Sequence, residues 1–113
     1  MKIGVTSQNF KTITGHAGKT RRFLVFSKND QGNWLESERL NLPKEMSMHE
    51  FRGVKHPIDD LDVLITAGCG EGFIRRMAAK GIKVVTTSEP DPVFAVTQYA
   101  SGETLPPAIP HTH

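Results

Sequence analysis

The sequence predicts one α/β domain built on a mixed sheet of about five strands, in which an antiparallel hairpin is followed by a parallel βαβα arrangement. The hairpin is indicated by two strand-like runs that flank a tight turn in residues 21–41. The parallel part is indicated by two short apolar runs on either side of a helical pattern in residues 62–87. A length of 113 residues is typical of one domain and is sufficient for a core without disulfides or a structural metal.

Strand signals dominate the first half of the chain. It opens with KIGVTS (2–7), in which apolar and polar residues alternate, and RRFLVFSK (21–28) is rich in aromatic and branched residues. The glycine-containing stretch NFKTITGHAGKT (9–20) between them predicts a loop. NDQGNW (29–34) predicts a hairpin turn, and the imperfect alternation of WLESERLNL (34–42) predicts an edge or curved strand paired to the one before it.

A βαβ unit is predicted in the second half. DVLIT (62–66) and IKVVTT (82–87) are compact apolar runs of the kind that parallel sheets bury on both faces. Between them, EGFIRRMAAKG (71–81) has a helical pattern and ends on a C-capping glycine. Its apolar residues at helical spacing are Phe73, Ile74, Met77 and Ala78. The crossover between the two strands is expected to be right-handed.

A second helix is expected in DPVFAVTQYASGE (91–103), with Pro92 in its first turn, where a missing N–H has no cost. The residues predicted to share its apolar face are Val93, Val96, Tyr99 and Ala100. These elements define a domain over residues 1–105, followed by a flexible Pro- and His-rich tail at 106–113. The histidines of this tail are His111 and His113.

The segment LPKEMSMHEFRGVKHPIDDL (42–61) follows neither the helical nor the strand period, and the sequence leaves the conformation of residues 42–57 open. Its last part predicts a short helix, with Pro57 at the first position and the carboxylates of Asp59 and Asp60 in the first turn. At a helix start, capping explains these carboxylates better than general acid and base catalysis does.

Charge and composition exclude several classes of function. A net charge of +2 is too small to indicate a nucleic-acid partner, which would require a clustered basic face. No apolar run approaches the roughly 18 residues of a membrane-spanning helix, and the first ten residues lack the apolar region of a secretory signal. The single cysteine excludes an intramolecular disulfide. We therefore expect a cytoplasmic protein with neither a membrane nor a nucleic acid as its partner.

The stretch ITAGCGEG (65–72) combines the end of a strand, a glycine-rich loop and the start of a helix. Glycines allow the backbone to approach a ligand closely, and the unpaired N–H groups of a helix start favour an anion. The spacing is neither the dinucleotide-binding fingerprint nor a Walker loop. The loop is thus either a ligand-binding turn, with Gly68, Gly70 and Gly72 as contacts, or a plain corner between strand and helix.

Cys69, in the middle of that loop, is the only thiol. A position near a helix N-terminus can lower a thiol pKa, which would make Cys69 a better nucleophile and a better metal ligand. A lone thiol supplies neither a zinc site nor a cluster site by itself, because no second cysteine is present. The alternative is that Cys69 is a small buried residue without a chemical role.

Three histidines outside the tail are candidate metal ligands, because imidazole suits many metals and soft sulfur ligands suit clusters. His16 lies in the loop after the first strand, whereas His49 and His56 lie in the middle segment. Lys19 and Arg21 follow His16 and are candidates to neutralise an anionic ligand. For each of these residues the alternative is an ordinary solvated surface position.

Four stretches together resemble one known family. They are MKIGVTS, GHAGKTRRFLVF, LDVLITAGCGEGFIRRMAAKGIKVV and PVFAVTQYASGE, and they span most of residues 1–105. This combination is similar to the dinitrogenase iron-molybdenum cofactor biosynthesis family, which includes NifX-like proteins and the C-terminal domain of NifB-like proteins. In that family the loop after the first strand typically reads His-Phe-Gly-Arg. The corresponding positions here are His16, Ala17, Gly18 and Lys19.

The resemblance implies an RNase H-like fold with a mixed five-stranded sheet, used as a binding scaffold and not as a nuclease. It implies that His16 contacts an iron-sulfur or iron-molybdenum type cluster, which is bound transiently. The family often has a His- and Gly-rich middle segment, of which MHEFRGVKHP, with His49 and His56, remains here. Cys69 falls where the family does not require a thiol.

Three functional hypotheses follow. The leading one is a non-enzymatic cluster carrier in metallocofactor biosynthesis, such as that of nitrogen fixation, which acts as a monomer or weak dimer alongside cofactor-assembly proteins. The second is a small enzyme whose phosphorylated substrate is held by the glycine loop at residues 68–72. The third is a protein-interaction module with an exposed apolar edge formed by Trp34, Met46 and Met48.

Overall fold

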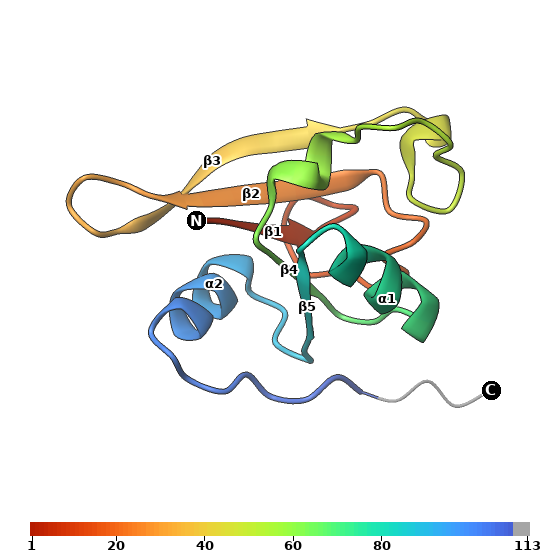
Figure 1. Cartoon of the computed structure of the whole chain (residues 1–113). Coiled ribbons are helices and arrows are strands. Elements are labelled where there is room, and N and C mark those ends of the chain that lie inside the picture. Colours follow the sequence, from red (N-terminus) through yellow and green to blue (C-terminus); the bar gives the residue numbers. More distant parts are fainter. Residues whose placement is uncertain (110–113) are drawn as a thin grey trace.

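The computed structural model describes residues 1–109 and contains one five-stranded sheet in the order β3-β2-β1-β4-β5 (Figure 1). Its strands are β1 (Lys2–Thr6), β2 (Arg22–Lys28), β3 (Trp34–Asn41), β4 (Val63–Thr66) and β5 (Lys83–Thr86). Its helices are α1 (Glu71–Ala79) and α2 (Pro92–Ala100), with short 3₁₀ turns η1 (Lys44–Met46) and η2 (Pro57–Asp60). The predicted α/β domain with a mixed sheet and two helices is confirmed.

Strand β1 lies at the centre of the sheet, antiparallel to β2 and parallel to β4. The β2–β3 hairpin closes at Gly32, whose φ of +85° is a conformation that glycine adopts without strain. The register shifts between Val25 and Phe26, so the edge strand β3 carries a bulge and bends, as its imperfect alternation predicted. Strand β5 extends the parallel side of the sheet beyond β4.

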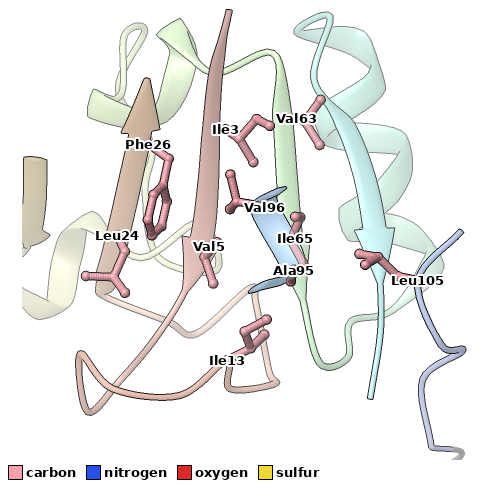
Figure 2. Close-up of a cluster of buried hydrophobic side chains, with 10 residues drawn as sticks. All are labelled: Ile3, Val5, Ile13, Leu24, Phe26, Val63, Ile65, Ala95, Val96 and Leu105. Atoms are coloured by element: carbon pink, nitrogen blue, oxygen red, sulfur yellow. The ribbon is translucent and has the colours of Figure 1, made fainter. Parts of the chain in front are cut away.

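Both faces of the sheet are buried, because successive side chains of each strand point to opposite faces. The cluster on the α2 face is shown in Figure 2 and consists of Ile3, Val5, Ile13, Leu24, Phe26, Val63, Ile65, Ala95, Val96 and Leu105. The cluster on the α1 face consists of Phe23, Val25, Met48, Phe51, Ile58, Leu61, Leu64, Met77 and Ile82. The middle segment therefore supplies core residues and covers the same face as α1.

The buried face of α2 differs from the predicted one. Pro92, Ala95 and Val96 are buried, whereas Val93 is 56% exposed and Ala100 is also exposed. The helix begins at Asp91, whose carboxylate accepts hydrogen bonds from the amides of residues 93 and 94 (3.0 and 3.2 Å). This cap turns Pro92 toward the sheet, and the helical repeat then places positions 95, 96 and 99 on the sheet side.

Helix α1 buries a narrower stripe than its apolar residues predicted. Met77 is fully buried and Phe73 is half-buried, but Ile74 and Ala78 are exposed. The helix ends at Ala79, and Gly81 directly after the C-cap has a φ of +78°, the predicted left-handed conformation. Among the helices of residues 1–109, none has the length and apolar character needed to span a bilayer.

The middle segment contains the predicted short helix as η2, with Pro57 at its first position. Asp59 lies in its first turn, accepts a hydrogen bond from the backbone N–H of His56 (2.9 Å) and pairs with Lys80 of α1 (2.8 Å). The predicted exposed apolar edge is wrong, because Met48 is 1% exposed within the core on the α1 face.

The chain after α2 returns along β5. Leu105 is buried in the α2-face core, and the carbonyl oxygen of Pro106 accepts hydrogen bonds from Thr87 Oγ1 (2.6 Å) and the Ser88 N–H (3.3 Å). The last positions of the tail, with His111 and His113, lie outside the residues that the structure describes.

Candidate functional site

The site is built where the carboxyl ends of β1 and β4 lie side by side. Thr6 ends β1 and Thr66 ends β4, and their hydroxyl oxygens are 2.8 Å apart. The carbonyl oxygen of Thr14 lies 2.6 Å from the Thr6 hydroxyl and 3.1 Å from the Thr66 hydroxyl, and it accepts a bond from the Ala67 N–H (3.1 Å). The loop after β1 is therefore fixed to the loop after β4 by buried polar contacts.

His16 lies at a turn of the β1–β2 loop and has a φ of +53°, which is unusual for a residue other than glycine. Its carbonyl oxygen accepts hydrogen bonds from the N–H groups of Lys19 (2.9 Å) and Thr20 (3.1 Å). The next residue, Ala17, is buried and donates its N–H to the carbonyl oxygen of Gly68 (3.3 Å). These bonds place the exposed His16 beside the glycine loop.

The middle segment lines the site together with the β1–β2 loop and the glycine loop. The backbone N–H of His49 donates to the carbonyl oxygen of Gly18 (2.6 Å). The guanidinium of Arg76 on α1 donates to the carbonyl oxygens of Met48 (2.5 Å) and Phe51 (3.2 Å). Arg76 thus holds the middle segment against α1.

These three segments enclose a pocket of about 460 Å³. Its lining residues are His16, Ala17, Gly18, Lys19, His49, Gly68, Cys69, Gly70, Gly72 and Phe73. The structure thus brings seven of the sequence-predicted site residues together. Arg21 lies instead in an adjoining pocket, and His56 lines neither.

Glycine at positions 70 and 72 is not required by the fold. A Cβ added to Gly70 or Gly72 would meet no atom within 4 Å, and neither residue has a positive φ. Gly70 is the N-cap of α1 and makes no side-chain capping bond, so the first N–H groups of the helix, in a turn that lines the pocket, have no intrahelical acceptor. The absence of side chains here leaves the backbone open to a ligand.

Cys69 is half-buried, and burial raises the pKa of its thiol. The expectation of a lowered pKa is therefore wrong, because burial disfavours the charged thiolate. A thiol in this state is a poor free nucleophile. It binds a metal only when the metal displaces its proton.

His56 does not belong to the site, which argues against its predicted role as a metal ligand. It is 2% exposed and caps η2, with Nδ1 accepting a bond from the Ile58 N–H (3.1 Å). Its Nε2 is hydrogen-bonded to the carbonyl oxygen of Met46, and its ring packs edge-on against Phe51 with centroids 4.8 Å apart. Both ring nitrogens are thus engaged in holding the middle segment together.

The stability of the fold is expected to depend on pH through His56. Burial lowers the pKa of its imidazole, although the bond to Met46 raises it in part. Below the ordinary value of about 6.5 the unfolded chain therefore binds more protons at this residue than the folded protein does. The contribution of His56 to the free energy of unfolding is complete above that pH and is lost as the pH falls through the folded pKa.

Urea unfolding of the wild type and of His56→Asn between about pH 5 and pH 8 measures this dependence. Asparagine keeps an acceptor suited to the N-cap but does not titrate. We expect a smaller slope of unfolding free energy against pH in the variant. Equal slopes in the two proteins would exclude His56 as the group responsible.

Phe73 is a pocket residue that the sequence analysis assigned to the helix core. It is half-buried and lies in the first turn of α1, three residues after Gly70. Its place directly after a glycine loop is the signal that would have identified it.

Among residues 1–109, no group of three or more His, Cys, Asp or Glu is arranged to hold a metal ion.

The comparison with known families adds to this geometry. The model of the family described as dinitrogenase iron-molybdenum cofactor matches residues 1–102. The chain belongs to this family. This membership connects the protein to the biosynthesis of the iron-molybdenum cofactor.

Two solved structures share the fold of this family member. One is the crystal structure of PH0822, with a TM-score of 0.69, 18% identity, and coverage of 91% of this chain and 93% of that one. The other is the NMR structure of TM1290 from Thermotoga, described as a provisional NifB protein of the DUF35 family. It has a TM-score of 0.62, 12% identity, and coverage of 99% and 97%. No curated protein matches significantly.

Proposed function

We propose that this protein is a non-enzymatic carrier that binds an iron-sulfur or iron-molybdenum type cluster transiently, as cargo, in the pocket between the β1–β2 loop and the glycine loop. The observation that carries the proposal is the convergence of His16, His49 and Cys69 with glycine backbone in that one pocket. Family membership links the chain to the same class of cofactor.

The donor set suits a cargo better than a resident metal ion. Residues 1–109 offer no cage of three protein ligands, but a preassembled cluster brings its own sulfides and needs few further ligands. Imidazole and thiol groups bind iron, and backbone N–H groups at a helix start stabilise negative charge on sulfides. Because the pKa of Cys69 is raised, cluster coordination by its sulfur would release a proton and strengthen as the pH increases.

The pocket lining favours binding over hydrolysis. The residues that form it within the described chain include no Asp or Glu, so they provide neither a carboxylate base nor the acidic pair of a nuclease. The strand order β3-β2-β1-β4-β5 is compatible with the RNase H-like class that the family resemblance implies. We place this carrier in the cytoplasm, where it exchanges its cargo with cofactor-assembly proteins.

The test is an anaerobic titration of the purified protein with a precursor iron-sulfur cluster, followed by gel filtration and analysis of iron, molybdenum and sulfide in the protein peak. Stoichiometric co-elution of iron and sulfide is the expected result. A metal-free protein peak at every ratio of cluster to protein would overturn the carrier function.

Substitution of Gly72 tests whether the cargo approaches the backbone. Gly72→Ala is expected to leave the free energy of unfolding unchanged or raise it by up to about 1 kcal/mol, because alanine favours a helix and meets no atom here. Cluster affinity is expected to fall, since the methyl group would stand over the first helical turn.

Gly81→Ala is the matched control for this variant. Gly81 lies outside the pocket at the other end of α1 and has a φ of +78°, so alanine there is expected to lower stability by about 1 kcal/mol without changing cluster affinity. Cluster binding is measured by the same co-elution. If Gly72→Ala binds the cluster as the wild type does, close backbone contact at this position is ruled out.

A further inference from the structure

A second pocket of about 450 Å³ adjoins the first and has a different chemistry. It lies between the β1–β2 loop and the η1 region of the middle segment. Its lining residues are Lys19, Arg21, Lys44, Ser47, His49 and Glu50. Lys19 and His49 line both pockets, so a ligand in one lies next to a ligand in the other.

Positive charge dominates this second pocket. Lys19, Arg21 and Lys44 face a single carboxylate, that of Glu50. Within residues 1–109 the ion pairs are those of Arg39, Arg75 and Lys80, so none of the three cations of the pocket has a carboxylate partner within 4.0 Å. Three cations held near one another without acidic partners attract an anion to this place.

Ser47 provides a neutral donor in the same pocket. It is 4% exposed, and backbone bonds fix it, since its carbonyl oxygen accepts from the N–H groups of Glu50 (3.1 Å) and Phe51 (2.8 Å). Its hydroxyl takes part in none of the side-chain hydrogen bonds of residues 1–109, although it belongs to a residue that lines the pocket. The hydroxyl itself is open to solvent, so it is available to donate a hydrogen bond to a ligand in the pocket.

We propose that this second pocket binds an oxyanion of the carboxylate or phosphate type, with Lys19, Arg21 and Lys44 compensating its charge and the Ser47 hydroxyl donating a hydrogen bond. The oxyanion is either a group carried by the cargo of the first pocket or a separate small ion. Only the first of these sources rests on the carrier function proposed above. The site is distinct from the glycine loop, none of whose residues lines it.

Inorganic phosphate is the probe that tests the site without any cluster. Titration of the ¹⁵N-labelled protein with phosphate, at constant ionic strength and constant pH, is expected to give saturable shifts of the Lys19, Ser47 and Glu50 amide signals. In Lys44→Gln the dissociation constant is expected to rise about tenfold, because a charged hydrogen-bond donor is lost. Ser47→Ala is expected to weaken binding by a smaller factor.

Lys55→Gln is the matched control, because Lys55 is an exposed cation of the same segment that lies outside the pocket. Absence of saturable shifts, or an equal loss of affinity in Lys44→Gln and Lys55→Gln, would overturn the site. Saturable shifts centred on residues 68–72 would also overturn it, because they would place the anion on the glycine loop.

A second arm identifies the source of the oxyanion. Phosphate is titrated into protein already loaded with a precursor cluster and into the same protein without it. Displacement of phosphate by the cluster would assign the pocket to a group of the cargo, whereas unchanged phosphate affinity would assign it to a separate ion. Because the first arm uses no cluster, failure of the carrier function leaves the phosphate result intact.

Discussion

His16→Asn is expected to weaken cluster binding by at least about tenfold while leaving the fold unchanged. In the proposed cluster site the imidazole is the nitrogen ligand from the β1–β2 loop, and loss of one ligand to a metal centre costs at least the equivalent of a strong charged contact. Asparagine tolerates the left-handed backbone at φ +53°, so the substitution removes the ligand without straining the turn. Co-elution of iron with the protein and its thermal midpoint are the two measurements.

Two further variants make this result interpretable. His16→Ala removes the same imidazole but adds backbone strain, so it is expected to lose cluster binding and also some thermal stability. His49→Asn, on the opposite wall of the pocket, is expected to have a smaller effect on binding. Full cluster stoichiometry in His16→Asn would remove His16 from the site, whatever the behaviour of the other two.

Arg76→Met is expected to destabilise the fold by about 1–2 kcal/mol and to loosen residues 47–51 more than any other part of the chain. The guanidinium donates to two backbone carbonyl oxygens, that of Met48 and that of Phe51, which also accepts from Arg52, and hydrogen bonds from charged groups are among the stronger ones. Methionine keeps the length of the side chain and its helix propensity but donates nothing. Hydrogen exchange of the amides and urea unfolding measure the two effects.

The neighbouring residue on the same helix is a natural control. Arg75 forms an exposed ion pair with Glu71 at 3.9 Å, so Arg75→Met is expected to change stability by less than about 0.5 kcal/mol. If the two variants have the same stability and the same exchange pattern, Arg76 does not hold the middle segment.

Much of the site could be predicted from the sequence because it depends on local signals and on a general property of parallel sheets. The strand ends at Thr6 and Thr66 follow from hydrophobic runs, and the carboxyl ends of neighbouring parallel strands meet at one edge. Topology therefore brings the loop of His16 and the glycine loop to the same edge, and hydrogen bonds between the two loops then fix their relative position.

The middle segment could not be predicted in this way, because its conformation depends on contacts between residues far apart in the sequence. The bond from His49 to Gly18, the guanidinium of Arg76 and the pair between Lys80 and Asp59 hold it in place, and none leaves a periodic pattern. For this reason the sequence indicated neither the burial of His56 nor the second pocket. The prediction of the apolar face of α2 was wrong for a more local reason, because the cap at Asp91 determines which side of the helix faces the sheet.

The contacts of Thr14 with both strand ends have a consequence for the thermodynamics of binding. Since the β1–β2 loop is already ordered by buried bonds to Thr6, Thr66 and Ala67, its conformational entropy is lost during folding and not when the ligand arrives. Calorimetry of ligand association should accordingly show a small change in heat capacity. Stopped-flow mixing should show an association rate limited by diffusion and orientation. On the side of the β1–β2 loop a ligand would therefore meet a surface that is already formed, and discrimination between ligands would depend on how well each fits it.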